Sequence, residues 1–107
     1  MNVAWSPHAN SLFLDILAQI EDALSIEDAY RWRERILDDA DRLADLPFSG
    51  AIVPAECFHT IPANADKLRQ VICKPYRIVY EPVGDEIHIL SIRHSRMLVT
   101  MDDTAWN

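Results

Sequence analysis

Two consecutive helix-period stripes in the first half of the chain constrain its fold more than any other feature. Ser6-Pro7 reads as a helix N-cap followed by proline at the first helical position, where a missing N–H loses no partner. Ser25, with Asp28 three residues later, predicts a second helix directly after the first, and the breakers at 47–50 end it. The residues that line the two inner faces are Ala9, Leu12, Phe13, Ile16, Ile20 and Leu24, then Ala29, Trp32, Arg33, Ile36, Ala40 and Leu43. An antiparallel helical hairpin is therefore expected.

The second half of the chain has the composition of strands. Three segments are rich in β-branched and aromatic side chains, and the Pro-containing and Gly-containing sequences between them read as turns. A short apolar strand is also expected at residues 1–5, ahead of the first helix. The three later segments, which we expect to form consecutive antiparallel strands, are 67–73, 76–81 and 86–93.

The predicted element order is β-α-α-β-β-β in a single domain, residues 1–107, with an α+β fold. The helical hairpin is expected to cover one face of an antiparallel sheet and to leave the other face open. Residues 50–66 contain Pro54 and Pro62 and show no sustained periodicity. This segment is expected to be a long loop, either a binding segment or a mobile one.

Charge is distributed unevenly along the chain. The formal net charge is −7, and residues 1–66 carry four arginines against twelve acidic side chains. Residues 67–96 instead carry six basic side chains against three acidic ones. The basic residues of the second half either alternate out of the sheet into solvent or form a nucleic-acid site.

Several function classes find no support in the composition. The histidines never fall at helical metal-ligand spacing, so neither a metal nor another cofactor is expected. Cys57 and Cys73 are expected to be free thiols rather than a disulfide. No apolar run approaches the roughly 20 residues of a membrane span, and residues 1–5 do not open a secretory leader. The expected location is the cytoplasm.

Several local sequences, taken in order, resemble the RelE/ParE toxin superfamily of type II toxin–antitoxin systems. Residues 5–9 are similar to its opening "W-S-P-x-A", and residues 43–50 to its "L-x-x-x-P-x-x-G" helix end. Leu68-Arg69 and residues 75–80 resemble its "L-R" and "Y-R-I-V-Y" strands, and residues 92–96 its closing "V-x-H-x-R-R". The match spans nearly the whole chain.

The resemblance also suggests a chemistry for Arg77, which strand alternation places on the face without helices. In the mRNA-cleaving branch it implies that an arginine at this position stabilises the charge that builds on a phosphate. Arg69 and Arg96 would then hold the phosphate and His94 would move a proton. The structural alternatives are arginines paired with glutamates across the ladder, a solvated Arg96, and a partly buried histidine hydrogen-bonded to backbone.

Two features favour the ParE-like branch of the superfamily over the nuclease branch. Residues 97–107 lack the tyrosine that many of these nucleases carry near the C-terminus, and the chain is acidic overall. The resemblance implies that ParE-like toxins block DNA gyrase by binding and not by catalysis. The predicted function is therefore that of a gyrase-binding toxin. The alternatives are a RelE-like nuclease acting on the ribosome and mRNA, and a degenerate toxin that binds only its antitoxin.

The resemblance implies a cognate antitoxin that wraps the toxin and neutralises it, with DNA gyrase as the target. A homo- or hetero-oligomer with the antitoxin is compatible with the sequence. The candidates for apolar contacts with the antitoxin, each of which could instead belong to the core, are Trp5, Phe13, Tyr30, Trp32 and Phe48. Trp106 belongs either to a frayed tail or to a segment that a partner orders. The predicted target-binding residues are Arg69, Arg77, Arg93, His94 and Arg96.

Overall fold

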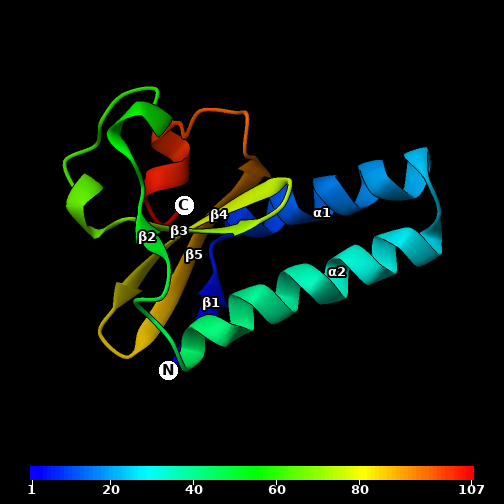
Figure 1. The fold of residues 1–107 in the computed structure, drawn as a ribbon, viewed down its shortest axis with the longest axis horizontal. Coiled ribbons are helices and arrows are strands. Elements are labelled where there is room, and N and C mark those ends of the chain that lie inside the picture. Colours follow the sequence, from blue (N-terminus) through cyan, green and yellow to red (C-terminus); the bar gives the residue numbers. More distant parts are fainter.

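The computed structural model describes residues 1–107, and at its centre is a five-stranded sheet (Figure 1). Its strands are β1 (Asn2–Trp5), β2 (Ala51–Ile52), β3 (Arg69–Cys73), β4 (Tyr76–Val83) and β5 (Glu86–His94). They lie in the order β1-β5-β4-β3-β2. The last three strands are consecutive and antiparallel, as the sequence predicts.

One edge of the sheet differs from the expected all-antiparallel arrangement. β1 pairs in parallel with β5, in the register Asn2 with Glu86 through Trp5 with Ile89, so the sheet is mixed. The local sequence does not reveal this direction, because β1 and β5 are joined by no turn and lie at opposite ends of the chain. The α+β class and the helical hairpin are confirmed.

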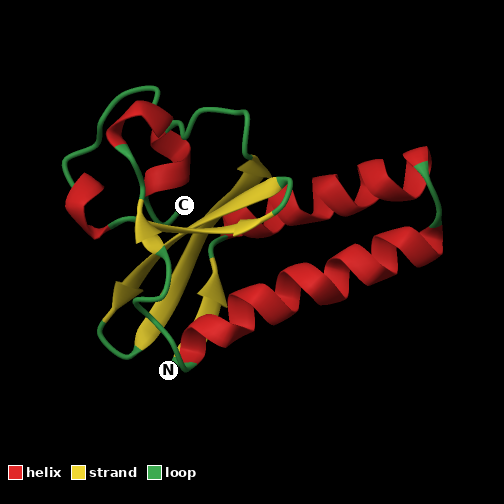
Figure 2. Ribbon diagram, viewed as in Figure 1, coloured by secondary structure: helices red, strands yellow, loops and turns green.

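The hairpin consists of α1 (Pro7–Ala23) and α2 (Ile26–Asp41), and α2 continues into the 3₁₀ turn η1 (Arg42–Ala44). Both predicted caps are present: the Ser6 and Ser25 hydroxyls each accept a backbone hydrogen bond at 3.0 Å, from Ala9 and Asp28. The far half of the hairpin extends beyond the sheet (Figure 2). Leu24, predicted to be core, is 66% exposed because it lies at that far end. Neither helix is long and apolar enough to cross a membrane.

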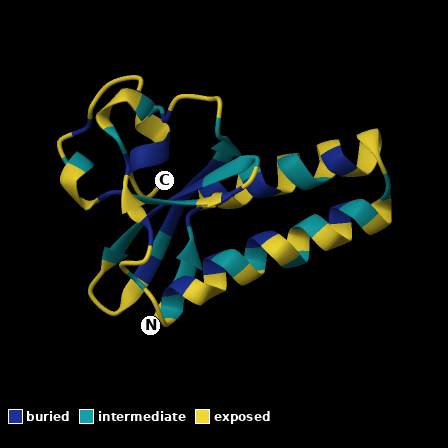
Figure 3. Cartoon of the chain, viewed as in Figure 1, coloured by how far each residue is buried: buried dark blue, intermediate teal, exposed yellow.

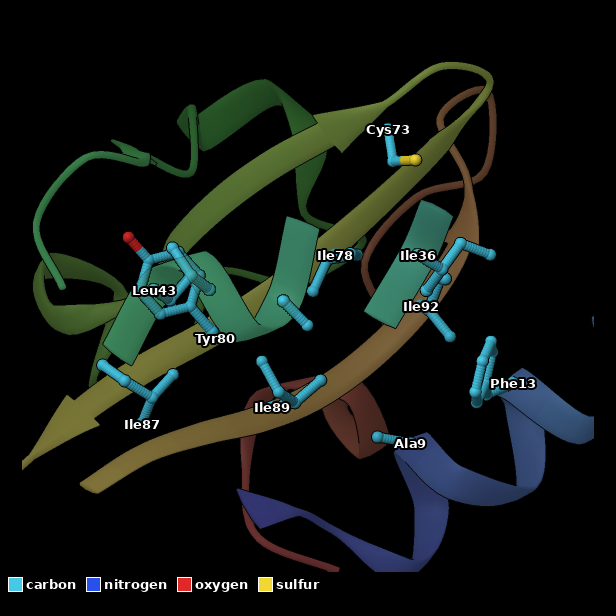
Figure 4. Close-up of a cluster of buried hydrophobic side chains, with 11 residues drawn as sticks. Ala9, Phe13, Ile36, Leu43, Cys73, Ile78, Tyr80, Ile87, Ile89 and Ile92 are labelled. Carbon is cyan, nitrogen blue, oxygen red and sulfur yellow. The ribbon is translucent and has the colours of Figure 1, made fainter. Parts of the chain in front are cut away.

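The main core lies between the hairpin and the sheet (Figure 4). Small residues of the helices, Ala9 and Ala40, let the helix backbones approach the sheet, and larger side chains fill the space between them. Each fully buried isoleucine contributes roughly 1.5–3 kcal/mol relative to an exposed one. The larger members of this core are Phe13, Ile36, Leu43, Ile78, Tyr80, Ile87, Ile89 and Ile92.

A β-bulge in the central pair decides which residues of β5 face the helices. The register shifts between Val79 and Tyr80, whose partners are Ser91 and Ile89, so Leu90 is left without a partner in β4. Ile89 and Ile92 consequently both join the main core although they are three residues apart, and Leu90 joins Val79 on the other face. Without the bulge, strict alternation would place every later residue of β5 on the opposite face of the sheet.

The second face of the sheet is covered, so the expectation of an open face is wrong. Residues 53–68 fold over it with the 3₁₀ turns η2 (Ala55–Cys57) and η3 (Ala65–Lys67), followed by η4 (Met101–Thr104) near the C-terminus. Figure 3 shows buried residues within both the sheet and these loops. The segment lacked periodicity because single apolar residues anchor it. These anchors and their partners in the sheet are Val53, Phe58, Leu68, Val79, Leu90 and Val99.

Candidate functional site

Arg69, the first residue of β3, holds the segment that follows the helical hairpin. One terminal nitrogen donates to the Gly50 carbonyl at 2.7 Å and, more weakly, to the Phe48 carbonyl at 3.4 Å. The guanidinium also lies 5.0 Å from the centre of the Phe48 ring. Arg69 thus fixes the loop into β2 and makes none of the cross-strand glutamate pairs considered from sequence.

Tyr80 of β4, which is completely buried, also holds this loop. Its hydroxyl donates to the Pro47 carbonyl at 2.9 Å and accepts from the Gly50 N–H at 3.0 Å. Burial raises the pKa of the Tyr80 hydroxyl, despite the opposing effects of the Gly50 hydrogen bond and the Arg69 charge. The tyrosine therefore stays neutral and can donate and accept at once.

Arg77 lies on the face without helices, as alternation predicts, but under the covering loops. Its Nε donates to the Gln70 side chain at 2.9 Å, and one terminal nitrogen donates to the Met97 carbonyl at 3.1 Å. The other terminal nitrogen lies 3.5 Å from the Cys57 sulfur. Arg77 joins β4 to both covering segments, and its guanidinium is half-buried.

Arg93 lies directly across the ladder from Arg77, and Asp103 compensates its charge. The Arg93 Nε contacts both Asp103 carboxylate oxygens, at 2.8 and 3.1 Å, and the aspartate side chain is 1% exposed. His8, at the start of α1, contacts the same carboxylate at 2.8 Å. This cluster ties the C-terminal turn to both the sheet and the first helix.

The position of Asp103 predicts a specific loss of stability in acid. Burial raises the pKa of its carboxyl, but hydrogen bonds from Arg93, His8 and the Thr100 backbone, with the Arg93 charge, outweigh burial and leave the pKa below its usual value. A depressed pKa contributes stability that is complete above the unfolded pKa of about 3.9 and is lost as pH falls through the folded value.

We expect the free energy of unfolding, measured by urea denaturation from pH 7 to pH 2.5, to fall more steeply below about pH 4 in the wild type than in Asp103→Asn. The other carboxylates are the same in both proteins, so the difference between the two curves isolates Asp103. Parallel curves would show that this carboxyl is not stabilised in the folded chain.

His94 and Arg96 lie where β5 ends. The Arg96 N–H donates to His94 Nδ1 at 3.1 Å, and the His94 ring contacts Tyr76 edge-on with 6.4 Å between centres. Ser95 N–H donates to the Pro75 carbonyl at 2.8 Å, which joins this end of β5 to the β3–β4 turn. The Arg96 side chain is exposed and makes no hydrogen bond or ion pair.

The five predicted site residues therefore do not meet in one cleft. In the β3–β4 ladder, Arg69 lies opposite Tyr80, and Cys73 lies opposite Tyr76 beside the turn. Arg69 is therefore four residues, or about 13 Å along the strand, from the end of β3 where His94 and Arg96 lie. Arg77 and Arg93 are neighbours beneath the covering layer. Only His94 and Arg96 lie together at an accessible end.

Sequence reasoning missed His8 and Asp103, the partners of Arg93. A signal for the aspartate was present, because Thr100-Met101-Asp102-Asp103 has the spacing of a capping box. The structure has this box, with Asp103 Oδ2 accepting from the Thr100 N–H at 3.0 Å. At the end of the chain, Trp106 packs on His88 with 4.7 Å between ring centres and stays 48% exposed.

No group of His, Cys, Asp or Glu side chains has the arrangement of a metal site. Cys57 and Cys73 are free thiols. Burial, helped by the neighbouring Asp39, raises the pKa of the Cys73 thiol to about 11, so this group stays protonated at neutral pH.

A small α+β domain with a helical hairpin on one face of its sheet, together with the ordered motifs at 5–9, 43–50, 68–80 and 92–96, defines a toxin of the type II toxin–antitoxin class. The family model described as "ParE toxin of type II toxin-antitoxin system, parDE" matches residues 3–99. The chain therefore belongs to the ParE toxin family, and the predicted superfamily is confirmed.

A solved structure described as "Chromosomal ParDE TA system from P. aeruginosa" is similar to this chain, with 22% sequence identity and a TM-score of 0.70. The similarity covers 88% of this chain and 95% of that one, and it shows a shared fold. No curated protein matches the sequence. As a ParE toxin of a type II system, the chain has an antitoxin partner.

Proposed function

We propose that this ParE toxin stops bacterial growth by binding DNA gyrase without catalysis, and that its antitoxin neutralises it. The observation that supports binding over RNA cleavage is the engagement of the three strand arginines. Arg69, Arg77 and Arg93 all donate to acceptors within the protein. They are therefore not free to stabilise charge on a phosphate in a transition state.

The covering layer supports the same proposal. RNA that bound the Arg77 guanidinium would have to compete with the Met97 carbonyl that already accepts from it. The layer also contains no tyrosine in residues 97–107 that could take part in proton transfer. The accessible members of the predicted set are His94 and Arg96, which suit contact with a protein partner.

The proposal predicts inhibition of purified gyrase. Toxin made by cell-free synthesis is expected to inhibit DNA supercoiling and to leave translated mRNA intact. Arg96→Ala is expected to weaken inhibition about tenfold or more, as for an arginine at the centre of an interface. The matched control is Arg42→Ala, since the Arg42 side chain is also exposed, at 67%, but lies in η1 and not after β5.

Ribosome-dependent cuts in mRNA that disappear in Arg77→Ala would reverse the proposal in favour of the nuclease. Growth arrest is expected on induction of the toxin alone and rescue on co-expression of the antitoxin. An absence of both growth arrest and gyrase inhibition would leave a protein that binds only its antitoxin.

A further inference from the structure

Most cationic side chains of this protein are already paired or hydrogen-bonded. Four of its ten lysine and arginine side chains make no ion pair and no hydrogen bond to an oxygen atom: Arg35, Lys67, Lys74 and Arg96. Three of these four lie around the β3–β4 turn, and Lys67 lies apart, in η3. Unpaired positive charge is therefore concentrated at one end of an acidic molecule.

The contacts between elements establish this grouping. The Arg35 guanidinium of α2 is close enough to the Cys73 thiol to oppose the rise in its pKa, and Lys74 is the residue after Cys73. Ser95, directly before Arg96, donates to the carbonyl of Pro75 in the same turn. Figure 1 shows this turn close to the end of β5.

A series of aromatic contacts joins Arg35 of α2 to the end of β5. Arg35 lies 4.9 Å from the centre of the Trp32 ring, and Trp32 meets Tyr76 edge-on at 5.4 Å. Tyr76 in turn meets His94 at 6.4 Å. All three rings are half-buried, whereas Arg35, Lys74 and Arg96 are exposed. We call these six residues the basic-aromatic end: Trp32, Arg35, Lys74, Tyr76, His94 and Arg96.

A shallow hollow adjoins this surface on α2. It has a volume of about 200 Å³ and is lined by Asp28, Arg31, Trp32 and Arg35. Asp28 already pairs with Arg31 in this hollow, at 3.3 Å, so the Trp32 indole and the Arg35 guanidinium remain to contact a carboxylate side chain with an apolar neighbour. Arginine with tryptophan or tyrosine is also the combination most enriched among residues that dominate interface energies.

The charge around the basic-aromatic end favours a protein over a nucleic acid as its ligand. The net charge is −7, and α2 itself carries six acidic side chains, including Asp28 and Asp39 beside the surface. A long polyanion would meet this repulsion along its whole length. A short acidic segment can contact the three free cations alone.

We infer that the basic-aromatic end binds an acidic protein segment of gyrase. The toxin would then contact the gyrase protein itself and not the DNA bound to it. The inference rests on the proposed function and deepens it, because it adds Trp32, Arg35, Lys74 and Tyr76 to His94 and Arg96. Binding to DNA-free gyrase is expected to weaken as salt rises, because the contact is between exposed charges.

The test reverses the three unpaired charges together, as Arg35→Glu, Lys74→Glu and Arg96→Glu. A matched control, Arg33→Glu, Arg42→Glu and Lys67→Glu, changes the net charge by the same amount and leaves all six residues of the basic-aromatic end in place. Binding to DNA-free gyrase is measured by biolayer interferometry, with circular dichroism to verify folding. We expect at least a hundredfold loss of affinity in the first variant and less than threefold in the control.

Each other outcome is distinguishable. Wild-type toxin that fails to bind or inhibit gyrase overturns the proposed function and, with it, this partner. Wild-type binding that both triple variants lose equally, or that both retain, overturns the basic-aromatic end alone. Binding that requires DNA and is lost in the first variant assigns the surface to phosphates instead. Arg96→Glu alone replaces the triple variant if the latter does not fold, and a loss of less than threefold would then reject the surface.

Discussion

Asp103→Asn is expected to lower the free energy of unfolding by about 3 kcal/mol, because it breaks a buried ion pair by removing one partner. The Asp103 carboxylate accepts from Arg93, from His8 and from the backbone and hydroxyl of Thr100. An asparagine amide would turn an N–H₂ group toward some of these donors. The expected loss is at the low end for such pairs because the Arg93 side chain remains 24% exposed and can regain water.

Urea denaturation at pH 7 measures this loss, and Asp102→Asn is the matched control. Asp102 is the preceding residue, is exposed, and makes no side-chain hydrogen bond or ion pair, so its replacement changes the charge alone. Surface changes of this kind are usually within about 0.5 kcal/mol. Equal effects of the two substitutions would mean that the cluster does not hold the C-terminal turn in place.

Gly50→Ala is expected to destabilise the protein by about 3 kcal/mol, the upper end for overpacking. A Cβ at this position would lie 2.5 Å from the Gln70 carbonyl oxygen and 2.7 Å from both Cε1 and the hydroxyl oxygen of Tyr80. Neither neighbour can yield easily, because one is sheet backbone and the other is a completely buried ring. The shift would also strain the hydrogen bond from the Gly50 N–H to Tyr80.

Thermal and urea denaturation measure the loss of stability in Gly50→Ala, and Gly84→Ala provides the comparison. Gly84 has open space around it but a φ of 57°, so an alanine there meets only the backbone penalty, about 1 kcal/mol. A larger loss at Gly50 than at Gly84 would show that close packing, and not backbone conformation, requires the glycine of the "P-x-x-G" sequence. The reverse order would show that the loop can move away from Tyr80.

Much of the secondary structure is predictable because its causes are local. The serine caps at Ser6 and Ser25, the apolar stripes of the helices and the prolines of the turns all act within a few residues. The family could be predicted because each of its motifs is a short run of residues that can be compared without knowledge of the fold. The motifs also depend on one another: Gly50 has no room for a side chain because Tyr80, a residue of another motif, lies against it.

The candidate site was less predictable. Arg69, Arg77 and Arg93 can be identified as strand arginines, but their acceptors come from Gly50, Met97 and Asp103 in loops without periodicity. The basic-aromatic end was hidden for a similar reason: Trp32 and Arg35 belong to a helix face that the sequence assigns partly to the core, and the fold brings them against Tyr76.

The sequence by itself determined the α+β class, both helices, the three long strands and the family, because caps, periodicity and turns act over short distances along the chain. Only the tertiary structure decided the parallel pairing of β1, the bulge at Leu90, the covering of the second face and the neutralisation of Arg93 by Asp103. The pairing, the covering and the neutralisation join segments that no local rule connects. The bulge depends on how β4 and β5 fit between two packed layers, which becomes definite only when the whole domain has folded.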